Sequence, residues 1–246
     1  MGRRQDQRAG LASTAMAATR GDVAWPTLAD RLRLAGGVMS QREGHAVAAH
    51  FGSAATELAV CVMRVGLAVR SDLDALEIAG PEPWLTHFLE EALGGRAPAT
   101  DEAVRTARSW CCRVAPDRAI VVGPWSAAAR WAGIVRHAVV TGAAVDCTDR
   151  SDSATALTLV GPRAARLLDD AGLEPDLPVG GVRESWFAGS SALLLRETAD
   201  RFLLVLDADY AVDAWRELFD VGRALGLSMV GAEALERLAA APGRIF

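Results

Sequence analysis

The chain has 246 residues, 51% of them hydrophobic, which is enough to bury the core of one large domain or two small ones. Its net charge of −5 excludes nucleic acid as the expected main partner. It contains no Lys and no Asn, so a Schiff-base lysine, a P-loop lysine and an asparagine-based polar clamp are all excluded.

The ends of the chain carry no clear targeting signal. The N-terminus begins with Met1-Gly2-Arg3-Arg4 but has no continuous apolar region after it, and no stretch approaches the ~20 apolar residues that would span a bilayer. We expect a cytoplasmic protein with no membrane partner. Residues 1–22 are interpreted as a mobile extension, and residues 23–246, which contain no linker, as a single domain.

The first predicted elements are a short amphipathic helix over 25–35, a strand or loop over 45–50, and a helix that starts after Ser53. Glu57 is expected on the surface of this last helix, and Gly66 is placed to end it.

An apolar strand that ends in Gly-Pro and leads into a helix occurs twice, over 75–81 and 156–162. Alternation puts Leu76 and Ile78 on one face of the first strand, and Leu157 and Leu159 on one face of the second. Gly supplies backbone freedom at the turn, and Pro is expected to set the first helical residue. The copies lie 81 residues apart (161 minus 80), too far for a solenoid, and indicate two related halves with a pocket between them.

The remaining patterns fill in both halves. Residues 103–110 are ambiguous between helix and strand, and the second half is expected to contain three consecutive antiparallel strands followed by two helices. In order, the other predicted elements are a loop at 94–100, a strand at 119–122, a helix at 125–137, a start of the second half at 143–146, a helix at 163–171, a loop at 174–181, strands at 182–187, 192–195 and 202–206, and helices at 210–225 and 230–240. The fold class predicted is α+β with antiparallel sheets.

The metal-binding residue types show no metal spacing. The four Cys residues are expected to be reduced and mostly buried, with Cys111 and Cys112 on opposite faces of a strand, and the four His residues are scattered. We therefore expect no metal site. Among the Trp residues, Trp84 and Trp215 are expected in the core, while others flank polar positions and are candidates for an aromatic-lined pocket.

Short motifs recur in a fixed order after residue 25. Glu57 precedes Gly66-Leu67, Ser71 and Gly80-Pro81, and in the second half Val145-Asp146 precedes the second Gly-Pro and a late helix with Trp215. This order resembles the folate-binding domain of the glycine-cleavage T-protein family. That family includes aminomethyltransferases, dimethylglycine and sarcosine oxidising enzymes and, closest in pattern, the gamma subunit of heterotetrameric sarcosine oxidase. The resemblance implies a T-protein-like fold, here without the family's C-terminal barrel.

The family's folate motifs are degenerate in this sequence. The span 105–110 holds no acid where the family has an Asp-Asp pair, Gly123 stands where the family has Asn, and the Asp-x-Ser motif is reduced to Ser71. The turn whose acid holds the pterin is shortened to residues 196–201. Tetrahydrofolate is the cofactor that the resemblance implies, but each unpaired buried donor of the pterin would cost roughly 1–3 kcal/mol. No other cofactor is expected.

Candidate site residues follow from residue type and from the resemblance. For acid–base chemistry they are Asp101, Asp117 and His50, each of which also has an ordinary structural interpretation. The pocket candidates are Phe51, Ser71, Trp110, Trp186 and Arg196.

Three hypotheses about function remain open. The first is a non-catalytic binding or assembly subunit, linked to one-carbon metabolism or amine oxidation, with a flavin-containing oxidase or a transferase as its partner. The second is a repurposed enzyme that acts on a small organic substrate without folate, for instance as a homo-oligomer. The third is a folate-dependent aminomethyl or methyl transferase with displaced acids.

Overall fold

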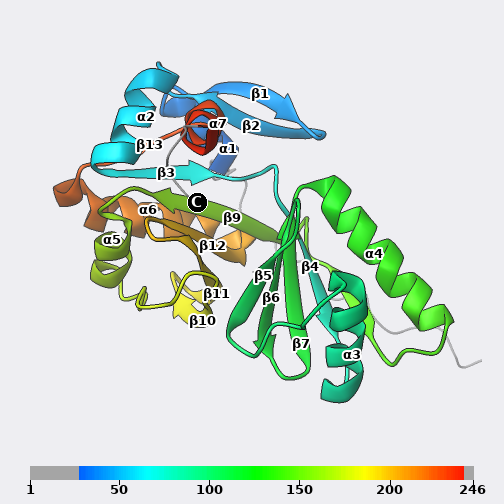
Figure 1. Ribbon diagram of the computed structural model, residues 1–246. Coiled ribbons are helices and arrows are strands. Elements are labelled where there is room, and N and C mark those ends of the chain that lie inside the picture. Colours follow the sequence, from blue (N-terminus) through cyan, green and yellow to red (C-terminus); the bar gives the residue numbers. More distant parts are fainter. Residues whose placement is uncertain (1–27, 241–246) are drawn as a thin grey trace, which may run out of the picture.

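The computed structural model describes residues 28–240, whose strands form two large sheets and one separate hairpin (Figure 1). The larger sheet has six strands in the order β10-β11-β12-β9-β3-β13. All its neighbours are antiparallel except β13 and β3. Its strands are β3 (Val65–Val69), β9 (Ala154–Val160), β10 (Val182–Phe187), β11 (Ser190–Thr198), β12 (Arg201–Asp207) and β13 (Leu227–Met229).

The second sheet has five antiparallel strands in the order β5-β6-β7-β4-β8. Its strands are β4 (Asp74–Ala79), β5 (Glu102–Arg105), β6 (Trp110–Ala115), β7 (Arg118–Gly123) and β8 (Asp146–Asp149). The separate hairpin pairs β1 (Val38–Arg42) with β2 (His45–His50). The helices are α1 (Leu28–Leu34), α2 (Ala54–Met63), α3 (Glu82–Leu93), α4 (Trp125–Val140), α5 (Ala164–Asp170), α6 (Ala211–Gly222) and α7 (Ala232–Ala240).

The two halves have the same connectivity. In the first, β4 leads through α3 to the meander β5-β6-β7 and then to α4. In the second, β9 leads through α5 to the meander β10-β11-β12 and then to α6. The strands that end in Gly-Pro are β4 and β9. The strand before β4 is β3, and it pairs with β9 in the other sheet; the strand before β9 is β8, and it pairs with β4. The predicted relation between the halves is therefore confirmed, and the halves exchange one strand each.

Successive side chains of a strand point to opposite faces of its sheet, and this alternation divides the apolar side chains of the two sheets among three layers. Leu76 and Ile78 point toward α3 and α4, and Leu157 and Leu159 point toward α5 and α6, as the sequence pattern predicts. The opposite faces of the two sheets meet in a third cluster that contains Ala75. The result is a helix–sheet–sheet–helix arrangement, and the antiparallel α+β class is confirmed.

Glycine is required at both Gly-Pro turns because backbones approach closely there. A Cβ on Gly80 would lie 2.6 Å from the carbonyl oxygen of Ala144, and one on Gly161 would lie 2.4 Å from that of Arg64. Only Gly161 also has a left-handed φ, of +126°. The prolines lie just before the helices and not at their first residue, because α3 begins at Glu82 and α5 at Ala164.

Several other local expectations are corrected. Gly66 lies inside β3 and does not end a helix, and β13 was not predicted as a strand. The ambiguous span 103–110 is a β-hairpin, made by β5 and β6.

The burial of two Trp residues differs from the prediction. Trp84 is 47% exposed and is not a core residue, whereas Trp215 is half-buried and packs against the core. The expected extension at 1–22 lies outside the described residues.

Candidate functional site

Several residues that match the family's folate motifs line a cleft where strand ends of the two sheets meet. Its lining includes Arg70 from the end of β3, Trp110 from β6, Gly123 from β7 and Glu197 from β11. Its volume is about 160 Å³. Pockets that enclose drug-sized ligands have about 300–1,000 Å³. The cleft by itself is therefore small for a whole folate, but it borders a cavity of about 410 Å³ with which it shares Arg105, Ala107, Arg108 and Ser109.

Glu197 is held by two side chains within the cleft. Trp110 donates its indole Nε1–H to Glu197 Oε1 at 2.8 Å, and Arg201 donates Nε–H to Glu197 Oε2 at 2.7 Å. The side chain of Glu197 is 11% exposed. Both carboxylate oxygens are thus engaged by groups of the chain itself, and the carboxylate already has a charged partner.

The rest of the cleft is rich in arginine. Arg105 lies over the ring of Trp110, 5.6 Å from its centroid. Arg70 makes a two-pronged ion pair with Asp72, with Nε–Oδ1 at 2.8 Å and Nη2–Oδ2 at 2.9 Å. Burial opposes ionisation of Asp72, but the hydrogen bonds from Arg70 outweigh it and lower the pKa of this carboxyl. The cleft therefore offers guanidinium groups to an anion and no free acid at its floor.

The tip of the β1–β2 hairpin closes one side of this region. Glu43, whose φ is +46°, makes an ion pair with Arg108 and accepts hydrogen bonds from the backbone N–H and the hydroxyl of Ser126, at 3.2 and 3.0 Å. The backbone hydrogen bond from Ser126 is the main cause that lowers the pKa of Glu43. Ser126 lies in the first turn of α4, so a carboxylate from a distant hairpin caps that helix.

The three acid–base candidates lie in separate places. Asp101 is exposed at the start of β5 with a φ of +65°, and its carbonyl oxygen accepts the backbone N–H of Val182. Asp117 lies in the turn between β6 and β7. His50 ends β2, where its Nδ1 accepts a hydrogen bond from the N–H of Gly52 at 3.3 Å. The described structure does not bring them together into one catalytic group.

Of the pocket candidates, Trp110 lines the cleft. Ser71 donates its hydroxyl to the carbonyl oxygen of Ala46, and Trp186 is 77% exposed on β10. Arg196 donates to the carbonyl oxygens of Leu177, Thr198 and Ala199, which ties neighbouring loops together.

Phe51 lies beside the carboxylate of Glu57, whose burial was not predicted from the sequence. Glu57, expected on a helix surface, is only 5% exposed. It accepts the N–H of Phe51 at 2.6 Å and the N–H of Gly231 at 2.7 Å. Gly231 is 174 residues away, so no local pattern could reveal the contact.

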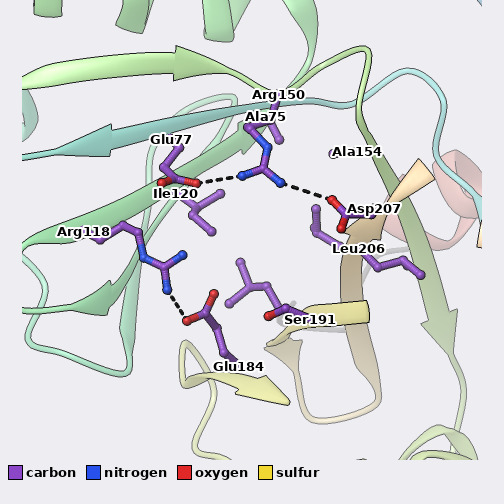
Figure 2. A pocket seen from close by; sticks show the side chains of 12 residues that line it. Ala75, Glu77, Arg118, Ile120, Arg150, Ala154, Glu184, Ser191, Leu206 and Asp207 are labelled. Carbon is purple, nitrogen blue, oxygen red and sulfur yellow. Dashed lines mark hydrogen bonds and ion pairs between the residues drawn. The ribbon is translucent and has the colours of Figure 1, made fainter. Parts of the chain in front are cut away.

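A second cavity lies at the mouth of the layer between the sheets and is called here the inter-sheet pocket (Figure 2). Its volume is about 140 Å³. Two sets of ion pairs join the sheets across it: Arg118 with Glu184, and Arg150 with both Glu77 and Asp207. Apolar side chains form its inner wall, and the full lining is Ala75, Glu77, Arg118, Ile120, Arg150, Ala154, Glu184, Ser191, Leu193, Val205, Leu206 and Asp207.

Within residues 28–240, no group of three or more His, Cys, Asp and Glu side chains is arranged to hold a metal ion. Cys111 and Cys112 point into different apolar clusters, as predicted. Burial raises the pKa of the Cys61 thiol to about 11 and that of Cys111 to about 12, so these thiols are protonated near neutral pH. No helix in the described residues is both long and apolar enough to cross a membrane.

The architecture is that of the T-protein folate-binding-domain fold. The glycine cleavage system aminomethyltransferase T from Bartonella henselae superposes with a TM-score of 0.70 at 20% identity, over 83% of this chain and 58% of that one. A chain of the heterotetrameric sarcosine oxidase from Corynebacterium sp. U-96 superposes with a TM-score of 0.59 at 20% identity, over 72% of this chain and 94% of that one.

This chain thus spans 58% of the length of the aminomethyltransferase. At this level of identity the likeness establishes the fold, while function has to be argued from the site. No protein-family model matches the sequence, and no curated protein matches it.

Proposed function

We propose that this chain is a T-protein-like binding or assembly subunit that does not itself catalyse a reaction and that works with a flavin-containing oxidase or a transferase in one-carbon or amine metabolism. The observation that carries the proposal is the state of Glu197, each oxygen of which already accepts a hydrogen bond, one from Trp110 and one from Arg201. A pterin donor would have to share these oxygens with Trp110 and Arg201 or displace them, and each displaced hydrogen bond to the carboxylate costs about 1.5–3 kcal/mol.

The separation of the acid–base candidates supports the same proposal. Asp101, Asp117 and His50 lie in different parts of the fold. The similarity to a chain of a heterotetrameric oxidase, which it covers to 94%, favours a role beside other subunits.

Purification of the tagged chain from its native cells, at its native level, tests the partnership. We expect a flavin-containing oxidase or a transferase to co-purify in a fixed ratio, seen as flavin absorbance and as defined bands. A chain that elutes alone or only as a homo-oligomer, with no flavin and no transferase, contradicts the proposal.

Calorimetry with 5-formyltetrahydrofolate tests the rival folate-dependent transferase. We expect no heat at millimolar ligand, with an active aminomethyltransferase as the positive control. Saturable heat that is lost in Glu197→Ala would show that the acid is released to bind a pterin, and would favour the transferase.

The inter-sheet pocket favours a second candidate, an enzyme that has been repurposed for a small organic substrate. That pocket combines carboxylates, guanidinium groups and an apolar wall. Turnover of a small substrate by the isolated chain, abolished by substitutions in the pocket, would support this candidate over the subunit.

A further inference from the structure

We propose that the inter-sheet pocket binds a small zwitterion, an α-amino acid with a short apolar side chain in the size range from alanine to valine. The pocket shares no lining residue with the Trp110–Glu197 cleft. The inference does not depend on the partner subunit proposed above.

The charges on the pocket rim come in both signs. Arg118 and Arg150 contribute two guanidinium groups, and Glu77, Glu184 and Asp207 contribute three carboxylates. Figure 2 shows the guanidinium of Arg150 between two acids, and that of Arg118 directed at Glu184 on the facing sheet. A ligand with one charge of each sign finds a partner for both, whereas a simple anion meets an excess of carboxylate.

The existing ion pairs leave hydrogen-bonding capacity unused. They engage Oε2 of Glu77, Oε2 of Glu184 and Oδ1 of Asp207, and so use one oxygen of each carboxylate. A carboxylate offers about four lone-pair sites, and a guanidinium has five N–H donors. The second oxygens are therefore suited to accept an ammonium group, and the remaining guanidinium N–H groups to donate to a ligand carboxylate.

The size and the wall of the pocket restrict the side chain of the ligand. The volume of about 140 Å³ is close to that of an engineered apolar cavity of about 150 Å³ that binds benzene. Ile120, Leu193 and Val205 supply an apolar wall. A short aliphatic side chain matches both features, and a long or charged one matches neither.

Saturation-transfer NMR on the isolated chain tests this inference with L-valine as the probe. Two single-charge relatives serve as ligand controls: isovalerate, which lacks the ammonium group, and isobutylamine, which lacks the carboxylate. We expect valine to bind, and both relatives to bind about tenfold more weakly, since each loses one charge-assisted contact. No transfer to valine at millimolar concentration, or isobutylamine binding as tightly as valine, overturns the proposal.

Variants locate the binding. Arg118→Gln removes one guanidinium, and we expect about tenfold weaker binding of valine. Arg183→Gln is the matched control, because Arg183 lies on β10 of the facing sheet, next to Glu184, is as exposed as Arg118 and pairs with Glu174 outside the pocket.

Ser191→Leu tests the same pocket without breaking an ion pair. Ser191 is an exposed residue of β11 that lines the pocket, so the larger side chain obstructs the cavity while the ion pairs remain. We expect this variant to melt at the wild-type temperature and to lose valine binding. Wild-type binding in Ser191→Leu, or equal loss in Arg183→Gln, would place the ligand elsewhere and overturn the proposal.

Discussion

Glu57 and Gly231 lie 174 residues apart in sequence, and the carboxylate of one accepts the backbone N–H of the other at 2.7 Å. The second oxygen of Glu57 accepts the N–H of Phe51 at 2.6 Å. One buried side chain thereby joins α2, the end of β2 and the start of α7. Gly231 also has no room for a side chain, since its Cβ would lie 2.1 Å from the carbonyl oxygen of Ala49.

Substitution of this carboxylate is expected to destabilise the protein. In Glu57→Gln, the amide can accept with its oxygen only, so one backbone N–H loses its charged acceptor. Loss of such a hydrogen bond costs about 1.5–3 kcal/mol, which chemical denaturation would measure. Glu217→Gln on the exposed face of α6 is the control and is expected to change stability by less than about 0.5 kcal/mol. Equal stability of both variants would contradict the assigned role of Glu57.

Gly161→Ala and Gly172→Ala separate backbone strain from steric clash. Both glycines have a positive φ, but only Gly161 has a backbone atom in the way, whereas Gly172 has nothing within 4 Å of an added Cβ. We expect about 1–3 kcal/mol of strain in both variants and a further loss of about 1–3 kcal/mol from overpacking in Gly161→Ala alone. Urea unfolding of the two variants measures the difference, and equal losses would show that the close approach to Arg64 is relieved.

Asp72 is expected to contribute stability that depends on pH. Its pKa is lowered in the folded state, so the contribution is present above the unfolded value of about 3.9 and is lost as the pH falls through the folded pKa. Asp72→Asn should cost about 1–3 kcal/mol near neutral pH, because Arg70 loses its partner, and progressively less as the pH falls through the lowered pKa of Asp72. Asp213→Asn, at an exposed ion pair, should show no such dependence.

The indole of Trp110 is expected to stabilise the cleft through its contact with Glu197. Trp110→Phe leaves Oε1 of Glu197 without its donor and should cost about 1–3 kcal/mol. Trp186→Phe, at a side chain that is 77% exposed, should be close to neutral. A neutral Trp110→Phe would show that water replaces the indole without loss.

Thiol labelling tests the burial of the cysteines. Burial raises the pKa of all four thiols, but Cys147 is only half-buried, so at pH 8 we expect it to react with a disulfide reagent before the buried Cys61, Cys111 and Cys112. In denaturant all four should react at similar rates. Rapid labelling of Cys61 in the native protein would reveal local opening of the contact between α2 and α7.

Local sequence patterns were sufficient to predict the two repeated units of strand, Gly-Pro turn and helix. Leu76 and Ile78, with the Gly80-Pro81 turn after them, predict a strand, its buried face and the following helix from adjacent residues alone. The meander β10-β11-β12 follows from the same kind of signal, because β11 and β12 contain apolar runs and each turn is short.

Tertiary context decided the elements that were missed. Gly66 resembles a helix terminator in sequence. In the structure, residues 66–69 of β3 pair with residues of β9 about 90 positions later in the chain. Glu197 lies in the span 196–201 that the sequence presents as a shortened turn, but it belongs to β11, and its partner Trp110 is 87 positions away. Trp84 has core-like spacing on α3, yet lies on the outer side of that helix. Of the five pocket candidates, Trp110 alone lines the cleft, and the contact of Glu197 with Arg201 was not predicted.

The exchange of β3 and β8 between the sheets has a consequence for how the chain assembles. Neither half can complete its own sheet, because each central Gly-Pro strand is flanked by a strand borrowed from the other. Separately expressed halves would each present a bare edge where the borrowed strand belongs, and would recover their order only on mixing. We therefore expect folding to depend on contacts between distant parts of the sequence, which are slow to form.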